Sequence, residues 1–206
     1  MEPQWLLWAR EIQALAQTGL TFSTDAYDLE RYQRLRAIAA EMFAAGSDAP
    51  LERITALFEQ ELGYPTPKVD VRGAVFRDDR ILLVRETDDG RWTLPGGWAD
   101  VNQTARESVE REIEEESGYR ARAVKLVGVW DYRRQGHIAR HPYSIYKMFF
   151  LCELTGGAPA VSHEISAVDF FPLDALPQLS LGRVNPAQIR LMDAHRRRPE
   201  LMTEFD

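Results

Sequence analysis

Five glutamates crowd a short stretch that the sequence predicts to be the end of a helix: Glu110, Glu112, Glu114, Glu115 and Glu116. Like charges at helical neighbour spacing repel, and the C-terminal end of a helix already carries partial negative charge. The run therefore weakens the helix in isolation, whereas a bound divalent cation would stabilise it. The first chemistry that the residue types suggest is the binding of a metal ion.

The boundaries of that helix are also visible in the sequence. Thr104-Ala105-Arg106-Glu107 has the form of a capping box, and Gly118 is placed to end the helix in a left-handed conformation. At about 100° per residue, Glu112, Glu115 and Glu116 share one face, next to a buried stripe. Carboxylates at that spacing suit Mg²⁺ or Mn²⁺. A solvated acidic face is the alternative, but it explains neither the capped start nor the preceding Gly96-Gly97 pair.

These residues together resemble the signature of the Nudix hydrolases, G-x5-E-x7-R-E-U-x-E-E-x-G-U, where U is a large apolar residue. Gly97 matches the first glycine, and the later positions are filled by Arg111, Glu112, Ile113, Glu115, Glu116, Gly118 and Tyr119. The chain departs at Gln103, where the signature has a glutamate that mainly supports the signature arginine. Gln103 can still accept a hydrogen bond from Arg111, without charge assistance. We expect weaker support for the loop and an intact metal site.

Four further segments, 98–101, 143–147, 149–153 and 179–183, resemble a narrower branch of the family with a helical N-terminal extension. The region from Trp5 to Ala44 resembles that extension. Members of this branch, such as those similar to CDP-choline and ADP-ribose pyrophosphatases, act on a nucleoside diphosphate linked to another moiety. The resemblance implies a Nudix α/β/α sandwich with a mixed sheet, preceded by a small N-terminal helical extension. It also implies metal-dependent hydrolysis to a nucleoside monophosphate and a phosphorylated product, and a homodimer formed through the N-terminal helices. Packing of these helices within the monomer is the alternative to the dimer.

The resemblance also assigns candidate roles. The metal ligands would be Glu112, Glu115 and Glu116, with the carbonyl of Gly97 as a further candidate, and Arg111 would orient Glu112 or the loop. In the family the general base comes from the signature helix or from a later loop, where Glu164 is the candidate; a solvated loop acid is an equal alternative for it. Candidates for substrate contacts are Trp130, Tyr132, His141, Tyr143 and Arg183, although each of them singly fits ordinary core or surface.

Composition limits the partners. A net charge of −7 argues against binding to nucleic acid polymers but not against a small nucleotide substrate. Cys152 is the only cysteine, which excludes an intrachain disulfide, and its apolar surroundings favour a buried, inert thiol. The chain shows no secretory signal and no apolar run of membrane-spanning length, so a soluble cytoplasmic protein is expected.

The pattern of apolar residues predicts an N-terminal extension over residues 1–64 and a Nudix domain over residues 68–206. The extension should hold helices at about 4–17, 25–45 and 51–62, with Gly19 ending the first. Strands are expected at about 69–76, 81–84, 91–94, 124–132, 145–154 and 167–171, a polar loop at 131–141, and closing helices at 172–176 and 185–195. Two other functions remain open: a house-cleaning hydrolase of damaged nucleoside triphosphates, and a regulatory module that binds a nucleotide without cleaving it.

Overall fold

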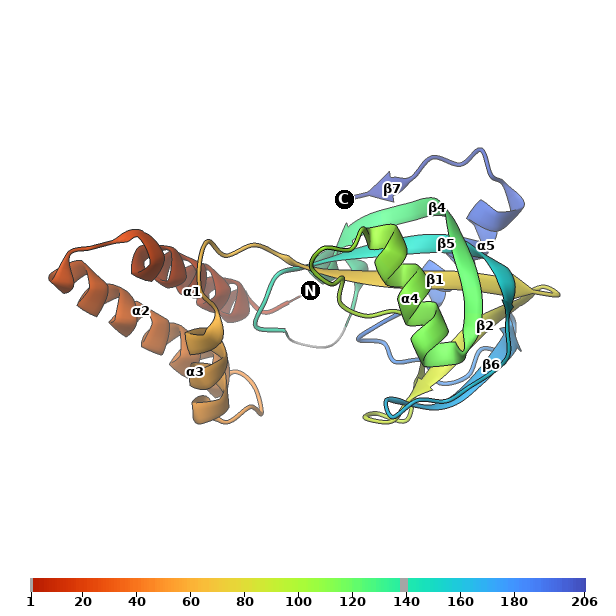
Figure 1. The fold of residues 1–206 in the computed structure, drawn as a ribbon. Coiled ribbons are helices and arrows are strands. Elements are labelled where there is room, and N and C mark those ends of the chain that lie inside the picture. Colours follow the sequence, from red (N-terminus) through yellow and green to blue (C-terminus); the bar gives the residue numbers. More distant parts are fainter. Residues whose placement is uncertain (1, 138–140) are drawn as a thin grey trace. The chain divides into compact units, whose positions relative to one another are not determined.

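The computed structural model describes residues 2–137 and 141–206 (Figure 1). These residues form two compact units. One consists of residues 2–67 and 141–144, and the other of residues 68–137 and 145–206. No helix in the part of the chain that the structure describes is long and apolar enough to cross a membrane.

The N-terminal unit contains three helices: α1 (Gln4–Phe22), α2 (Ala26–Ala45) and α3 (Leu51–Gln60). Asp25 caps α2, because its side chain accepts a hydrogen bond from the backbone N–H of Asp28. The prediction that Gly19 ends the first helix is wrong, since α1 continues to Phe22. A Cβ at Gly19 would lie 2.4 Å from the ring of Tyr32, so this glycine lets α2 pack closely against α1.

The two sides of α1 have an unusual distribution of polarity. Its buried residues include Arg10, Gln13 and Gln17. Its exposed residues include Trp8, Leu15 and Phe22, which are 53%, 60% and 66% exposed and spaced seven residues apart. Residues seven apart lie on one face of a helix. In this structure α1 therefore presents an apolar stripe to solvent.

The second unit is built on one mixed sheet. Its strands are β1 (Lys68–Arg77), β2 (Arg80–Glu86), β3 (Trp92–Thr93), β4 (Tyr119–Asp131), β5 (Ile145–Gly157), β6 (Ile165–Pro172) and β7 (Glu204–Phe205). The order is β3-β2-β1-β5-β4-β7, and β6 pairs with β2. The central pair β1 and β5 is parallel, and β4 runs antiparallel to β5.

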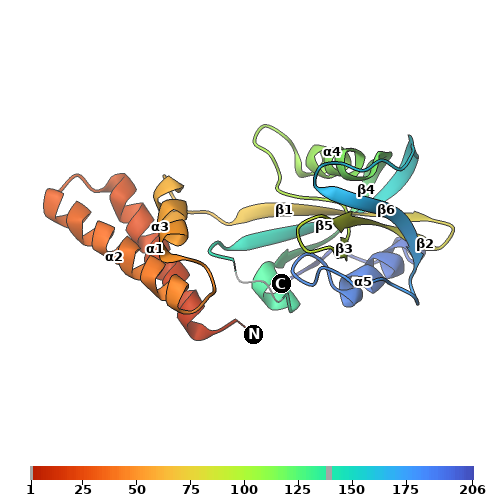
Figure 2. The same cartoon turned by 90° about the horizontal axis from the view of Figure 1, so that it is seen from below.

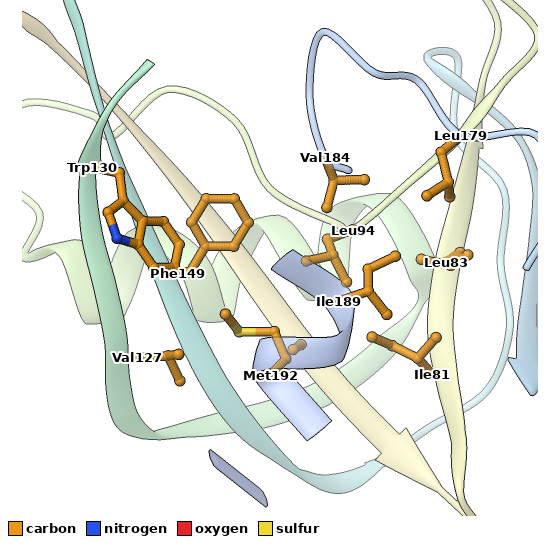
Figure 3. Close-up of a cluster of buried hydrophobic side chains, with 11 residues drawn as sticks. Ile81, Leu83, Leu94, Val127, Trp130, Phe149, Leu179, Val184, Ile189 and Met192 are labelled. Carbon is orange, nitrogen blue, oxygen red and sulfur yellow. The ribbon is translucent and has the colours of Figure 1, made fainter. Parts of the chain in front are cut away.

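Helices α4 (Ala105–Ser117) and α5 (Pro186–Arg197) cover opposite faces of this sheet (Figure 2). Beneath α4, Val109 and Ile113 pack with Val71 of β1. On the other face, Met192 of α5 packs with Trp130 and Phe149 (Figure 3). The expected mixed sheet between helices, preceded by N-terminal helices, is confirmed.

Two predicted segments differ from the structure. Residues 172–176 were expected to be helical, but β6 ends at Pro172 and a turn follows, closed by a hydrogen bond from Ala175 N–H to the Pro172 carbonyl. Prolines at 172 and 177 leave too few residues between them for a helix. The expected loop after β4 instead begins with a 3₁₀ helix, η1 (Tyr132–Gln135), capped by the Asp131 side chain.

Candidate active site

A glycine-containing loop runs beside the first half of β1. Val71 N–H donates to the Gly97 carbonyl at 2.8 Å, and Gly73 N–H donates to the Pro95 carbonyl at 2.9 Å. Gly96 has a φ of +141°, and a Cβ there would lie 2.0 Å from the Val71 carbonyl oxygen. Only glycine fits so close to a neighbouring backbone. The pair of glycines thus fixes the loop against the sheet.

Helix α4 begins and ends as predicted. The side chain of Thr104 accepts from Glu107 N–H, and the Glu107 carboxylate accepts from Thr104 N–H. Gly118 is left-handed, with a φ of +72°. The last turns of α4 meet the glycine loop: Gly96 N–H donates to Glu116 Oε2 at 2.8 Å. A Cβ on Gly97 would lie 3.2 Å from the carboxylate of Glu112.

The two inner carboxylates of α4 are hard to ionise. Glu116 is only 7% exposed, and burial raises its pKa to about 8 against the opposing effects of Arg72 and the Gly96 amide. Burial also raises the pKa of Glu112, with Arg111 opposing. The negative charges of Glu86 and Glu112 raise the pKa of Glu116 further. These carboxylates therefore lie where added positive charge would be favourable.

Arg111 is surrounded by acceptors. Its Nε donates to Gln103 Oε1 at 3.2 Å, in keeping with the expected support of the signature arginine by Gln103. Its other nitrogens lie 2.9 Å from Glu112, 2.5 Å from Glu115 and 3.0 Å from Asp100. Arg111 thus holds two of the three predicted metal ligands, and Glu115 points to it rather than inward.

A second charged cluster lies in the sheet itself and was not predicted. Asp70 of β1 and Lys147 of β5 are register partners, and their side chains approach to 3.0 Å. Arg72 lies two residues after Asp70 and donates to both of its carboxylate oxygens, at 3.0 and 2.8 Å. Burial opposes ionisation of Asp70, but Arg72 and Lys147 outweigh it and lower its pKa to about 2. Burial, with Arg72 adding to it, lowers the pKa of Lys147 to about 8 against the attraction of Asp70.

Arg72 links the two clusters electrostatically. Glu116 and Glu86 both raise the pKa of its guanidinium, after Asp70. Glu86 is paired in turn with Arg183, 2.9 Å away, and burial raises the pKa of Glu86. Arg183 also lies 2.9 Å from Asp88. The structure shows that Arg183 ties the turn after β2 to Glu86, and its role in substrate contact stays a prediction.

The other predicted site residues are placed as follows. Trp130 is buried in the core against Phe149. Tyr132 is buried, with His137 stacked on its ring at 4.6 Å and Lys147 at 5.8 Å from the ring centroid. Glu164 has an exposed side chain 3.3 Å from His163.

His141 and Tyr143 belong to the N-terminal unit rather than to the unit that carries the carboxylates. The structure thus brings together Arg111, the inner glutamates and the glycine loop. It also adds Asp70, Arg72, Glu86 and Lys147, which sequence reasoning missed. Charged residues alternating with valines in β1, and one of only three lysines within an apolar strand, were the available signals.

The donor set fits a hard divalent cation in its chemistry, because buried carboxylate oxygens with raised pKa values lie beside a backbone carbonyl. Among the described residues, however, no three His, Cys, Asp or Glu side chains are gathered closely enough to hold a metal ion. Glu115 would have to leave Arg111 to join Glu112 and Glu116.

Comparison with known proteins extends over the whole chain. Residues 66–194 match the NUDIX domain, and residues 3–58 match a UDP-X-like, N-terminal oligomerisation domain. YjhB of Bacillus subtilis, provisionally named an ADP-ribose pyrophosphatase, is 45% identical over 206 residues, covering 100% of this chain and 99% of that protein.

Two solved structures are also similar. The crystal structure of an ADP-ribose pyrophosphatase from Streptococcus suis is 40% identical, with a TM-score of 0.63, and covers 68% of this chain and 100% of its own. The crystal structure of a UDP-X diphosphatase is 33% identical, with a TM-score of 0.63, and covers 98% of each chain. Signature helix, fold and relatives agree, and the chain belongs to the Nudix hydrolase family.

Proposed function

We propose that this protein hydrolyses the pyrophosphate linkage of a nucleoside diphosphate joined to a second moiety, with ADP-ribose as the first candidate and CDP-choline as the second. The products would be a nucleoside monophosphate and a phosphorylated second product. The observation that carries the proposal is the hydrogen bond of 2.8 Å from Gly96 N–H to Glu116 Oε2, which joins the glycine loop to the carboxylates of the signature helix. The full-length similarity to proteins named for ADP-ribose and UDP-X supports the substrate class.

Nudix hydrolases generally use divalent metals. In this chain Glu112, Glu115 and Glu116 would hold Mg²⁺ or Mn²⁺, with the Gly97 carbonyl as a further ligand. That carbonyl accepts one hydrogen bond, from Val71 N–H, so one lone pair is left for a metal. The bound cation would neutralise phosphate charge and lower the pKa of a bound water.

The remaining residues would bind and orient the substrate. Two buried cations, Arg72 and Lys147, face one carboxylate, Asp70, and the surplus positive charge would attract a phosphate oxygen. Arg111 would orient Glu112 and Glu115, and Arg183 would hold the turn after β2 in place. Glu164 is the candidate for general base or extra ligand, and Tyr132, His141 and Tyr143 are candidates for contacts to the nucleoside or the second moiety. Trp130, which is buried against Phe149, would act from the core and not by direct contact with the substrate.

A substrate panel tests this function. ADP-ribose, CDP-choline, a UDP-sugar and an oxidised nucleoside triphosphate would each be incubated with the enzyme and Mg²⁺ or Mn²⁺. Products would be identified by chromatography and by the phosphate that a phosphatase then releases. We expect ADP-ribose to yield AMP and ribose phosphate. Preferential cleavage of the triphosphate would establish the house-cleaning function instead, and nucleotide binding without turnover would establish a sensor.

We also propose that the N-terminal unit forms a homodimer through the apolar stripe of α1, Trp8, Leu15 and Phe22. These three side chains are large apolar groups of α1 that are exposed to solvent, while Leu6, Ala9 and Ala16 are buried with the polar residues on the other side of the helix. Light scattering on Leu15→Glu tests the interface, with the exposed Glu11→Gln of the same helix as the control. We expect Leu15→Glu to be monomeric at tens of micromolar, and a wild-type monomer would overturn the proposal.

A further inference from the structure

Arg10 of α1 makes an unusual set of contacts. Its side chain is only 8% exposed, although arginine is rarely buried without partners. Nη1 and Nη2 donate to the two carboxylate oxygens of Glu2, at 2.5 and 3.0 Å. Nε donates to the main-chain carbonyl of His141 at 2.8 Å, and Nη2 donates to the same oxygen. The Arg10 guanidinium thus joins Glu2 to His141, which lies 131 positions after Arg10 in the sequence.

His141 belongs to a short segment that lies between two elements of the Nudix unit in the sequence. Residues 141–144 lie between η1 and β5, both of which belong to the Nudix unit, yet they pack as part of the N-terminal unit. Four residues before His141, His137 stacks on Tyr132, and its Nδ1 lies 3.0 Å from the Leu181 carbonyl. Six residues after it, Lys147 pairs with Asp70. Along the sequence, the segment that Arg10 holds therefore lies between His137 and Lys147.

We propose that Arg10 is a positioning residue for substrate binding, acting through its hold on the His141 carbonyl. The N-terminal unit would then fix the connection that leads into β5, in addition to any role in association. If this buried position of α1 served only for packing, an apolar side chain would suffice. If Arg10 served only to pair with Glu2, its bonds to the His141 carbonyl would not be needed. The fork geometry of arginine suits a carbonyl and a carboxylate at the same time.

Hydrogen exchange on the full-length protein tests the hold directly and needs no substrate. Arg10→Met removes all the donors, and Arg10→Lys keeps the charge with fewer of them. Arg34→Met is the control, because Arg34 pairs with Glu41 on the exposed side of α2 in the same unit. We expect Arg10→Met to speed exchange in a peptide spanning 141–147 about tenfold or more, Arg10→Lys to be intermediate, and Arg34→Met to match the wild type. Unchanged exchange in a folded Arg10→Met protein would overturn the proposal.

The kinetic test rests on the proposed function. With ADP-ribose we expect KM to rise about five- to twentyfold in Arg10→Met while kcat stays within about threefold, since the residue acts on binding. A fall in kcat at constant KM would contradict the positioning role. If the wild type does not cleave ADP-ribose, the proposed substrate is wrong. Hydrogen exchange over residues 141–147 would then still test whether Arg10 holds this segment.

Circular dichroism and light scattering show whether Arg10→Met folds and keeps its oligomeric state. If it does not fold, Arg10→Lys decides the question, because lysine keeps the charge but cannot place two donors on the His141 carbonyl. Faster exchange over 141–147 in Arg10→Lys would support the proposal, and wild-type exchange would refute it.

Discussion

The two charged clusters of the Nudix unit have net charges of opposite sign. On α4, Glu112 and Glu115 share the single guanidinium of Arg111, and the buried Glu116 lies on the same helix, so the cluster is short of positive charge. In the sheet, Arg72 and Lys147 both pair with the single carboxylate of Asp70, so these three side chains together carry a net positive charge. One cluster is suited to a cation and the other to an anion. Under the proposed function, a metal ion would balance the first cluster and a substrate phosphate the second.

The largest effect should come from removing one carboxylate of the α4 cluster. We expect Glu116→Gln to lower kcat by about two to four orders of magnitude, or about 3–5 kcal/mol of transition-state stabilisation. The fold should persist, because the amide oxygen of glutamine can still accept from Gly96 N–H. Steady-state kinetics at saturating Mg²⁺ would measure the effect. Glu114→Gln is the matched control, since this exposed glutamate lies on the same helix; near-normal turnover of Glu116→Gln would refute the ligand assignment.

A change in the sheet cluster should instead lower the free energy of unfolding. Asp70→Asn leaves Arg72 and Lys147 buried without their carboxylate, and removing one partner of a buried pair costs about 3–5 kcal/mol. Denaturant unfolding at pH 7 measures the loss in the free energy of unfolding. Glu153→Gln breaks an exposed cross-strand pair with Arg122 in the same sheet, and should cost about 0–1 kcal/mol. Equal losses in the free energy of unfolding would show that the buried pair contributes no more to stability than the exposed pair.

The same cluster predicts how stability depends on pH. The pKa of Asp70 is about 2 in the folded protein, below its ordinary value. Its ionisation therefore stabilises the fold fully above an unfolded pKa of about 4, and this contribution is lost as pH falls toward 2. The stability difference between wild type and Asp70→Asn should narrow by about 2 kcal/mol between pH 4 and 2. A difference that stays constant over this range would mean that Asp70 has an ordinary pKa.

The contrast between the clusters also explains what could be predicted from the sequence. The α4 cluster is local: Thr104, Gly118 and the glutamates lie on one helix whose geometry is known in advance. The sheet cluster depends on the parallel register that places Asp70 opposite Lys147, 77 positions apart in sequence numbering, and no local pattern specifies that register. Gly19 was misread for the same reason, because its role depends on Tyr32 of another helix.

The smallest expected effect concerns Gln103, where the chain departs from the family signature. Gln103 Oε1 accepts from Arg111 Nε and from Ser108 Oγ, each at 3.2 Å. Because Arg111 already faces the carboxylates of Asp100, Glu112 and Glu115, the negative charge that Gln103→Glu introduces adds little attraction. We expect kcat to stay within a few fold, and the free energy of unfolding to rise by less than about 1 kcal/mol, since the site is partly exposed.

Kinetics and thermal unfolding of Gln103→Glu, compared with Gln103→Ala, would separate charge from hydrogen bonding at this position. The alanine variant removes the acceptor for both Arg111 and Ser108, so it should lower stability more than the glutamate variant changes it. If Gln103→Glu lost activity as severely as Glu116→Gln, residue 103 would belong with the metal-binding glutamates. In that case the deficit of positive charge on α4 would extend back into the loop, and the two clusters would differ in size as well as in sign.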